Sequence, residues 1–445
     1  AYEVVVANTR KIADMCEPIA PVRPDKCPPV IENSDETLRN ICYNRAHEMY
    51  GENLPKIVTD RLERELTSII SNGFAVMYII AQKLVWKSNE DGYLVGSRGS
   101  VGSSFVATMS GITEVNPLSP HYYCTNCHYY DFDSEEVKKY SGMAGCDMPD
   151  KLCPVCGHPL TKDGFDIPFE TFLGFGGGKV PDIDLNFSGE YQARAHRHAI
   201  EMFGETQVFR AGTIGTLAEK TAYGFVKKYL EENGIVACRA EENRLTLGCV
   251  GTRRTTGQHP GGLVVVPDDK DMEDFCPVQH PADADDSDTI TTHFEYHSME
   301  ANILKLDMLG HDDPTMVRMM QDLTGVDPHE IPLDDPETMS IFISSKVLGY
   351  ENDPILGPTG AVAIPEFNTR FTRQMLIDTQ PKDFNTLVRL SGFSHGTDVW
   401  MGNARELILS GTASVLETVG CRDDIMLYLI SKGLDPKMSF KIMEK

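Results

Sequence analysis

The sequence predicts an α+β protein built from several domains, and three observations support this fold class. Apolar residues recur at helical spacing between Ser34 and Lys87, and again in runs that begin at His311. Short segments around Ile183 and Leu306 have the pattern of strands. The chain of 445 residues is too long for one typical core, so two to four domains are expected.

The N-terminal part of the sequence predicts helix, followed by a connector and then more helix. Residues 1–34 begin with a helical pattern and continue into a proline-rich stretch. Ser34 stands where a helix cap is expected, and Leu62, Leu66 and Ile69 lie at helical spacing after it. A glycine-rich turn at Gly96–Ser104 and a cysteine-rich insert at residues 122–160 separate this helical part from the predicted strands.

Composition and charge restrict the classes of function. The net charge of −25 lowers the expectation of nucleic-acid binding, because neutralising phosphates requires Lys and Arg. A local basic channel can nevertheless exist in an acidic protein. The longest apolar stretch, Gly73–Ala81, is about half a membrane span, so no membrane association is expected.

The cellular compartment is predicted from the first residues and the cysteines. No basic and apolar leader opens the sequence, so secretion is not indicated. Twelve cysteines without a leader favour a reducing, cytoplasmic location, where clustered cysteines usually hold metal. The sequence starts at Ala1 without Met and ends in a helix-like run, so we expect it to be a fragment.

The insert contains two C-x-x-C knuckles. Cys124 and Cys127 form the first, Cys153 and Cys156 the second, and Gly157 suits the tight turn of the second. Four thiolates predict one tetrahedral Zn²⁺ with a structural role, because no coordination position stays open for water. Buried cysteines or a redox C-x-x-C are the alternative, and Cys146 is a fifth thiol able to exchange as a ligand.

Three acidic residues stand in apolar strand patterns. Asp182 and Asp184 alternate with apolar residues, which places both on one face of a strand. Asp307 stands in a second apolar strand. Acids placed this way are costly without a cation, so the set suggests a two-metal site for phosphoryl or nucleotidyl transfer. A solvated edge strand is the alternative interpretation.

The glycine-rich turn is a candidate anion site. Its backbone N–H groups, its hydroxyls and the Arg98 guanidinium precede an apolar run beginning at Phe105, an arrangement that suits phosphate binding. The turn lacks the Lys-Ser/Thr ending of a P-loop. A flexible turn is the alternative.

Other polar clusters fall where loops are expected. Residues 253–262 are basic and glycine-rich and precede an apolar strand at Leu263–Val266. Arg370 and Arg373 lie one turn apart on a predicted helix, and His395 follows a stretch rich in Ser and Gly. Each cluster taken alone is also typical of an ordinary surface.

Six motifs together resemble one family, the C-family replicative DNA polymerase III alpha subunits, and specifically their PolC type. The motifs are collinear over nearly the whole sequence. They are GSRGSVGSSFVATM (96–109), PDIDLNFSG (181–189), RAGTIGTLAEKTAY (210–223), RTTGQHPGG (254–262), KLDMLGHDD (305–313) and SGFSHGTDVW (391–400).

The resemblance implies a polymerase-beta-like nucleotidyltransferase palm with a mixed sheet, a zinc-ribbon-like insert, a small helical thumb and partial helical fingers. The expected parts are a connector at 1–34, palm at 35–225 with the zinc insert at 122–160, thumb at 226–254, palm at 255–310 and truncated fingers at 311–445. The family's oligonucleotide-binding, exonuclease, histidinol-phosphatase-like and clamp-binding parts are not recognisable in full.

The resemblance also implies residue roles. Asp182, Asp184 and Asp307 take the places of the catalytic triad that binds two Mg²⁺, and the four knuckle cysteines take those of the Zn²⁺ ligands. Candidate dNTP and phosphate ligands are Gly96, Arg98, Gly99, Ser100, Gly102, Ser103, Arg370, Arg373 and His395. Candidate DNA contacts are Lys220, Arg253 and Arg254.

The expected function is DNA-directed DNA polymerisation, in which dNTPs are added to a primer 3′-hydroxyl and pyrophosphate is released. Primer–template DNA and dNTPs are the expected partners, with a sliding clamp and clamp loader binding through regions outside this sequence. Two alternatives stay open: a metal-dependent phosphohydrolase or nuclease, and a non-catalytic zinc-containing nucleic-acid-binding module.

Overall fold

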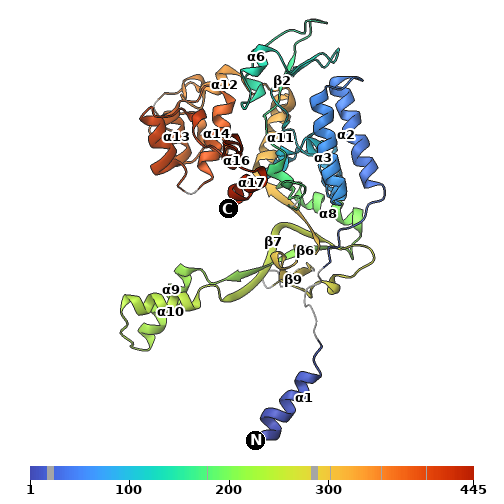
Figure 1. The fold of residues 1–445 in the computed structure, drawn as a ribbon. Helices are drawn as coiled ribbons and strands as arrows, with labels where there is room; N and C mark the ends of the chain where they lie inside the picture. The colour runs from blue at the N-terminus through green and yellow to red at the C-terminus, as the bar shows by residue number, and fades with distance from the viewer. Residues whose placement is uncertain (18–24, 178, 282–288, 301, 352, 397) are drawn as a thin grey trace. The chain divides into compact units, whose positions relative to one another are not determined.

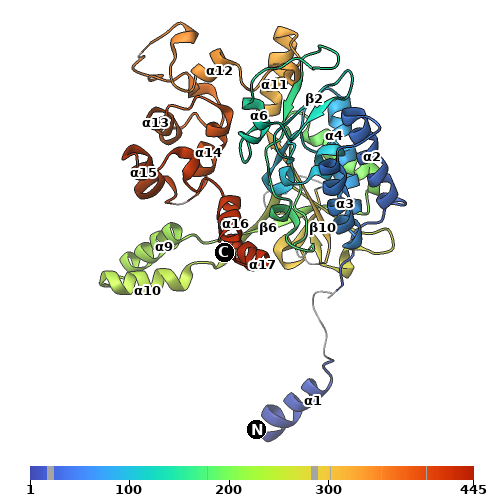
Figure 2. The same ribbon diagram turned by 45° about the horizontal axis from the view of Figure 1, so that its top comes forward.

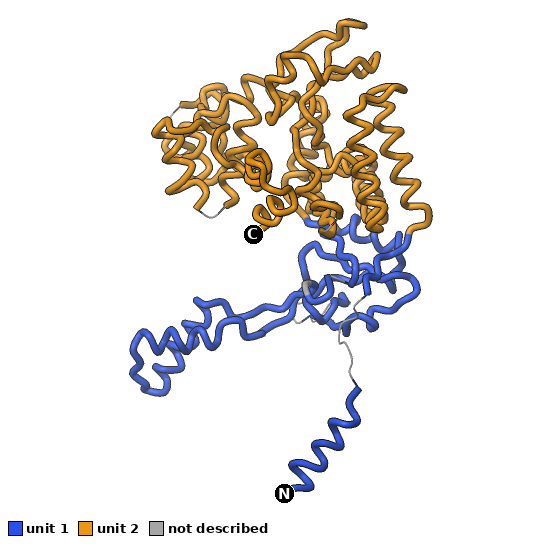
Figure 3. Tube along the Cα trace, in the orientation of Figure 1, with its two compact units in different colours: residues 1–30, 193–309 blue, residues 31–192, 310–445 orange. Residues whose placement is uncertain are grey.

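The computed structural model describes residues 1–17, 25–177, 179–281, 289–300, 302–351, 353–396 and 398–445 (Figure 1). These residues divide into two compact units, which Figure 3 shows in different colours. Unit 1 comprises residues 1–30 and 193–309, and unit 2 comprises residues 31–192 and 310–445. Each unit therefore combines two separate stretches of the sequence.

Unit 1 is organised around a mixed sheet. Its strands are β6 (Val208–Thr216), β7 (Arg253–Val265), β8 (Val278–Gln279), β9 (Thr291–Glu295) and β10 (Leu304–His311), whose last two residues belong to unit 2. β6 runs parallel to β9, whereas the pairs β10–β7, β7–β6 and β8–β9 are antiparallel. The predicted α+β class with a mixed sheet is confirmed.

The apolar core of unit 1 forms on this sheet. Ala211, Val264, Met299 and Ile303 are buried together. Gly212 is required where β6 meets β9, because a Cβ there would lie 1.9 Å from the carbonyl oxygen of Thr292. The segment after residue 24 joins this core, since the backbone N–H of Cys27 donates to the carbonyl of Asn302 at 2.6 Å.

A helical hairpin extends from the long β6–β7 ribbon. It consists of α9 (Glu219–Glu232) and α10 (Arg239–Cys249), which lie side by side (Figure 1). Ala222, Val226 and Leu230 are buried on one face of α9. Unit 1 also contains η1 (Glu3–Ala7), α1 (Asn8–Asp14), η4 (Met272–Asp274), η5 (Tyr296–Ser298) and most of α8 (Gln192–Phe203).

The prediction of a loop at residues 253–262 is wrong, because these residues form the first part of β7. Their backbone pairs with β6 from Thr216 to Gly212. Exposed polar residues on a two-stranded ribbon resemble a loop in sequence, since neither face of the ribbon requires the apolar alternation of a buried strand.

Unit 2 begins with three helices that form much of its core. They are α2 (Ser34–Tyr50), α3 (Lys56–Ser71) and α4 (Ala75–Glu90), which confirms the helical pattern. Leu38, Leu62, Leu66, Ile69 and Ile80 are fully buried. Among the described residues, no single helix has the length and apolar composition needed to cross a membrane; only α3 and α4 together pass that test, as a pair bent by 109°.

Short elements follow these helices and carry the candidate sites. They are β1 (Gly96–Arg98), η2 (Gly99–Ser103), α5 (Phe105–Met109), β2 (His121–Tyr123), β3 (Tyr130–Asp131), α6 (Glu135–Lys138), η3 (Gly145–Asp147), β4 (Thr161–Asp163), α7 (Glu170–Leu173) and β5 (Asp184–Ser188). β2 pairs with both β3 and β4 in a small antiparallel sheet, and β1 pairs with β5.

The C-terminal part of unit 2 is helical, as predicted. Its elements are α11 (Asp312–Thr324), η6 (Pro328–Glu330), α12 (Pro336–Ser340), η7 (Lys346–Leu348), η8 (Ala361–Ala363), α13 (Arg370–Thr379), α14 (Phe384–Ser394), η9 (Trp400–Ala404), α15 (Arg405–Leu409), η10 (Val415–Glu417), α16 (Arg422–Ser431) and α17 (Pro436–Glu444). Figure 2 shows α13, α14 and α15 as one group, which packs around Met375, Leu390, Phe393 and Trp400.

Candidate functional site

The glycine-rich turn and the first two acids meet through the pairing of β1 with β5. In this antiparallel pair Arg98 stands opposite Asp184, and Gly96 stands opposite Asn186. A Cβ on Gly99 would lie 3.8 Å from an oxygen of Asp184. The structure therefore brings the predicted phosphate turn and the predicted metal ligand Asp184 together.

Asp182 and Asp184 lie at the beginning of β5. The strand starts at Asp184, so Asp182 is in the preceding segment and is exposed, whereas Asp184 is half-buried. The alternation continues into the strand, where Leu185 and Phe187 are buried on the opposite face. The apolar side chains fix the face of β5, and the acids occupy the other face.

Asp307 lies in β10 of unit 1 between the buried Leu306 and Met308. Lys305 Nζ is 2.9 Å from Asp307 Oδ2. The other oxygen, Oδ1, is buried and accepts no hydrogen bond from any described residue. A buried carboxylate oxygen without a donor is costly, and this oxygen therefore suits a cation.

His259 lies near Asp307. Its Nδ1 is 4.0 Å from Asp307 Oδ1. The same nitrogen accepts hydrogen bonds from the backbone N–H groups of Gly261 and Gly262, at 3.2 and 2.7 Å. A nitrogen that accepts hydrogen bonds has no proton to donate, so His259 Nδ1 does not satisfy Asp307 Oδ1.

The N-terminus of α5 is already occupied by an internal carboxylate. Glu65 is fully buried and accepts hydrogen bonds from the backbone N–H groups of Phe105 and Val106, each at 3.0 Å. Ser104 Oγ donates to it at 2.9 Å, and Arg61 pairs with it. A phosphate at this turn would consequently meet the residues before Ser104 rather than the helix end.

Exposure divides the turn into two parts. Gly96, Arg98 and Gly99 are exposed and Ser100 is half-buried, whereas Gly102 and Ser103 are buried. Gly99 has φ +77°, a conformation that favours glycine. The accessible part that a triphosphate could contact is therefore Gly96 to Ser100.

The predicted DNA contacts lie on the ribbon and hairpin of unit 1. Lys220 is exposed near the start of α9, and Arg253 and Arg254 are exposed at the start of β7. The Arg254 guanidinium lies 5.8 Å from the ring centre of Phe225. The described fold therefore gathers these cations at the junction of the ribbon and the helical hairpin.

The remaining predicted phosphate ligands lie in the helical part of unit 2. Arg370 and Arg373 are one turn apart on α13, as predicted. Arg373 donates to the carbonyl of Leu356 at 2.7 Å, whereas Arg370 is exposed. His395 follows α14, where its Nδ1 contacts the carbonyl of Ser391 at 2.7 Å and its Nε2 lies 3.2 Å from Glu366.

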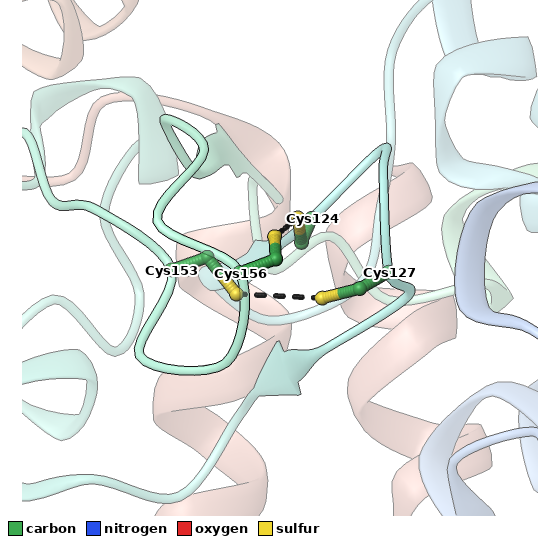
Figure 4. A group of neighbouring side chains, drawn as sticks. All are labelled: Cys124, Cys127, Cys153 and Cys156. Carbon is green, nitrogen blue, oxygen red and sulfur yellow. Dashed lines mark hydrogen bonds between the residues drawn. The ribbon is translucent and has the colours of Figure 1, made fainter.

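The four knuckle cysteines converge on one point (Figure 4). Their sulfur atoms all lie within 4.8 Å of one another, with Cys124 to Cys156 at 3.4 Å and Cys127 to Cys153 at 3.5 Å. All four are free thiols. The geometry matches a tetrahedral thiolate site and not a redox pair within one knuckle.

The two knuckles share one backbone geometry. In each, the N–H of the first cysteine donates to the carbonyl five residues later, from Cys124 to Tyr129 and from Cys153 to His158. The residue after the second cysteine is left-handed in both, with φ +60° at His128 and +75° at Gly157. The glycine predicted for the second turn is thus favoured, and His128 fills the same place in the first.

The environment of the thiols favours thiolate at one position. The backbone N–H of His158, followed by the side chain of Asn126, lowers the pKa of Cys156, whereas the pKa of Cys127 in the same group is raised. Thiolate is the form that binds metal. Cys146 lies outside the group of four, and burial raises its pKa to about 12. The prediction that Cys146 could exchange as a ligand gains no support from this position.

Two sets of described side chains are therefore of the kinds that hold metal ions: the four knuckle cysteines and the aspartates 182, 184 and 307. Two carboxylates with structural roles near these sites were not predicted. Glu65 was detectable as an acid among Leu62, Leu66 and Ile69 on an apolar helix face. Asp147 interacts with the distant residues Phe384 and Asn385, and no local pattern reveals that contact.

Comparison with known families matches nearly the whole chain. Residues 36–241 and 231–310 match the model of the bacterial DNA polymerase III alpha NTPase domain. Residues 313–445 match that of the bacterial DNA polymerase III alpha subunit finger domain.

Individual relatives carry the same name in several organisms. The chain is 60% identical to the PolC-type DNA polymerase III of Caldanaerobacter subterraneus subsp. tengcongensis, and 59% identical to those of Staphylococcus aureus (strain N315) and Clostridium perfringens. Each alignment covers 100% of this chain but 31%, 31% and 30% of the relative. The chain therefore spans about a third of the length of these proteins.

Proposed function

The chain belongs to the family of bacterial DNA polymerase III alpha subunits, and from this membership we propose that it performs template-directed nucleotidyl transfer in a replicative polymerase of the PolC type. The observation that carries the proposal is the collinear match over the full chain at 60% identity. The substrates would be dNTPs and the 3′-hydroxyl of a primer paired with template DNA.

Asp182, Asp184 and Asp307 would hold two Mg²⁺ ions. The buried, unsatisfied Oδ1 of Asp307 and the partly buried Asp184 fit a cation site. A bound Mg²⁺ pair would supply activation of the primer hydroxyl and neutralisation of the triphosphate. The protein residues would fix the positions of the reactants and keep the carboxylates oriented.

The end of β10 contacts the residue that follows β5 within unit 2. The strand extends from Asp307 to His311, whose carbonyl accepts a hydrogen bond from the N–H of Gly189 at 3.0 Å. Gly189 directly follows β5, five residues after Asp184.

Arg98 and the exposed glycines of the turn would bind the triphosphate. Arg98 stands opposite Asp184 in the β1–β5 pair, so a phosphate held by its guanidinium would lie beside the proposed metal ligand. Guanidinium binds phosphate oxygens with two parallel hydrogen bonds, and backbone N–H groups would offset charge that develops on the leaving pyrophosphate.

The cationic residues outside the glycine-rich turn would bind DNA or the incoming nucleotide. Lys220, Arg253 and Arg254 would contact the DNA backbone, and Arg370, Arg373 and His395 would contact the incoming nucleotide. The parts of the family then map as palm at 35–225 and 255–310, thumb at 226–254 and fingers from 311. The cysteine group would hold one structural Zn²⁺, and a clamp and clamp loader would bind elsewhere on the longer protein.

A primer-extension assay tests the function. We expect the chain to extend a labelled primer–template in the presence of Mg²⁺ and dNTPs. Asp184→Asn and Asp307→Asn should reduce extension at least about a thousandfold, because they remove charge stabilisation at the reacting atoms. Asp60→Asn, which changes an exposed acid of α3, should leave the rate unchanged.

The same assay separates the rival functions. Shortening of the primer without dNTPs would identify a nuclease and contradict the proposal. Unchanged extension by Asp184→Asn would remove Asp184 from the mechanism. DNA binding without either reaction in the unmodified chain would favour a binding module.

A further inference from the structure

The cysteine-rich insert contacts the helical C-terminal part of unit 2 through one carboxylate. Asp147, the last residue of η3, accepts a hydrogen bond on each oxygen, from the backbone N–H groups of Phe384 and Asn385, both at 2.9 Å. These are the first two residues of α14. Asp383 accepts from the third N–H, that of Thr386, at 2.7 Å. The first turn of α14 is thus satisfied mainly by a residue of the insert.

A second contact joins the same two regions. Lys162 of β4 pairs with Asp334, which precedes α12, and with Asp150 of the insert at 2.7 Å. Its side chain is only 11% exposed. The rings of Phe165 and Phe384 lie 6.3 Å apart. Three kinds of interaction therefore connect the insert, together with Lys162 and Phe165 that follow it, with the start of α14 and the segment before α12.

On the side of the insert, Asp147 is held by the sheet that carries the cysteines. The N–H of Gly145 donates to the carbonyl of Gly164 at 2.7 Å. A Cβ on Gly145 would lie 2.0 Å from the carbonyl oxygen of Asp163, so the two backbones are in direct contact. β4 pairs with β2, which leads directly into Cys124. The knuckles and Asp147 are thus connected through one small sheet.

On the other side, α14 determines the position of the proposed nucleotide ligands. Leu387, Leu390 and Phe393 of α14 share a core with Met375 and Leu376 of α13. α13 carries Arg370 and Arg373, and His395 follows the end of α14. A change in the direction of α14 would therefore move all three of these side chains.

We propose that the cysteine insert is a brace for the finger region and that Asp147 is a positioning residue for nucleotide binding. The metal at the four cysteines would keep the insert rigid, and Asp147 would transmit that rigidity to α14. This inference rests on the proposed polymerase function only in that it names a nucleotide as the ligand whose binding Asp147 supports.

Single-nucleotide incorporation by Asp147→Ala tests the kinetic part. The KM for dNTP should rise about tenfold, which corresponds to the loss of a charge-assisted hydrogen bond. The kcat and the Kd for primer–template should change less than twofold. Asp147→Asn keeps one accepting oxygen. Its KM for dNTP should therefore lie between those of the unmodified chain and Asp147→Ala. Asp133→Ala, an exposed acid of the same insert, is the matched control.

Hydrogen exchange tests the structural part without any activity. Peptides covering residues 384–394 should exchange faster in Asp147→Ala than in the unmodified chain. Chelation of the metal should accelerate the same peptides in the unmodified chain but add nothing further in Asp147→Ala. That non-additivity is expected only if metal and carboxylate act along one path.

Three outcomes would overturn the brace. Unchanged exchange over 384–394 in Asp147→Ala would show that the carboxylate does not hold α14. Additive effects of chelation and substitution would show independent paths. A weaker primer–template Kd with an unchanged KM for dNTP would make the insert a DNA-binding element. An inactive unmodified chain with the expected exchange pattern would contradict the polymerase proposal and leave the brace supported.

Discussion

At the scale of single residues, buried acids explain how the phosphate turn is held. Glu65 has no exposed surface, and its carboxylate accepts from the backbone of α5, from Ser104 and from Arg61. Arg61 in turn donates to the carbonyls of Ser103 and Ile167, at 2.8 and 3.0 Å. The pair therefore fixes the end of the glycine-rich turn and leaves its beginning free for a ligand.

Replacing Glu65 with Gln should destabilise unit 2 strongly. The change leaves Arg61 without its buried partner, and breaking such a pair costs on the order of 3 kcal/mol. Urea unfolding followed by circular dichroism measures the effect. Glu63→Gln is the matched control on the same helix, because Glu63 is 48% exposed and an exposed pair contributes less than about 1 kcal/mol. An equal loss of unfolding free energy in both variants would contradict the stabilising role of Glu65.

The buried side chain of His196 should make the stability of unit 1 sensitive to acid. Its Nε2 lies 3.3 Å from the carbonyl of Met308, and burial, followed by the charge of Arg210, lowers its pKa from 6.5 to about 4. Between these values the unfolded chain binds more protons than the folded one. The stability that His196 contributes is therefore complete above pH 6.5 and is lost as the pH falls toward 4.

The size of that loss is measurable with a substitution. A shift from 6.5 to about 4 corresponds to roughly 3 kcal/mol. His196→Gln, which cannot titrate, should lose correspondingly less stability between pH 6.5 and 4 in urea unfolding monitored at each pH. His198→Gln, on the same helix and in contact with exposed Glu201, should behave like the unmodified chain. Parallel pH profiles for all three proteins would disprove the assignment.

At the scale of elements, the two knuckles place different residues at the same left-handed position. Both place a left-handed residue after the second cysteine. In the first knuckle this residue is His128, whose ring nitrogen is 3.4 Å from the carbonyl of Met49. In the second it is Gly157, where a Cβ would meet nothing within 4 Å. Only backbone strain is therefore at issue at Gly157.

Gly157→Ala should consequently weaken the insert by about 1 kcal/mol, the cost of a left-handed residue with a Cβ. His128→Gly should be close to neutral, because the backbone strain that it removes offsets the greater flexibility of glycine in the unfolded chain. Thermal unfolding of the metal-loaded chain and competition for zinc with a chelating dye would report the two effects. A neutral Gly157→Ala would show that the turn relaxes around the new side chain.

The sequence predicted the elements whose patterns are local. Leu62, Leu66 and Ile69 indicated α3, the C-x-x-C spacing indicated the cysteine group, and alternation around Asp184 indicated β5. It failed at residues 253–262, because a ribbon with two polar faces lacks the alternation of a half-buried strand. It also failed at Asp147, whose partners are more than 230 residues away in the sequence.

At the scale of the whole molecule, the net charge of the chain and the placement of its cations have opposite effects on DNA binding. The net charge is −25, yet Lys220, Arg253 and Arg254 are all exposed near one junction of unit 1. Local cations can bind DNA on an acidic protein only if their contacts outweigh the repulsion from the rest of the chain. DNA binding should therefore be weak and strongly dependent on salt.

Changing each of these cations to Ala should lower the affinity for primer–template DNA and reduce the slope of log Kd against log salt by about one. Fluorescence anisotropy across a salt series gives both quantities. Lys11→Ala, an exposed cation of the N-terminal helix α1, serves as the control. A slope that stays constant in all three variants would place the DNA elsewhere.

The segmented construction of the two units also affects the order in which the protein can fold during synthesis. Unit 2 needs residues 310–445 to complete the core begun by residues 31–192, while all of residues 193–309 leave the ribosome in between. β5 must therefore wait for β10 until Gly189 can bond to His311. β5, with its apolar residues Leu185 and Phe187, stays without the later part of unit 2 during this interval, which makes the nascent chain a candidate client for chaperones that bind exposed apolar segments.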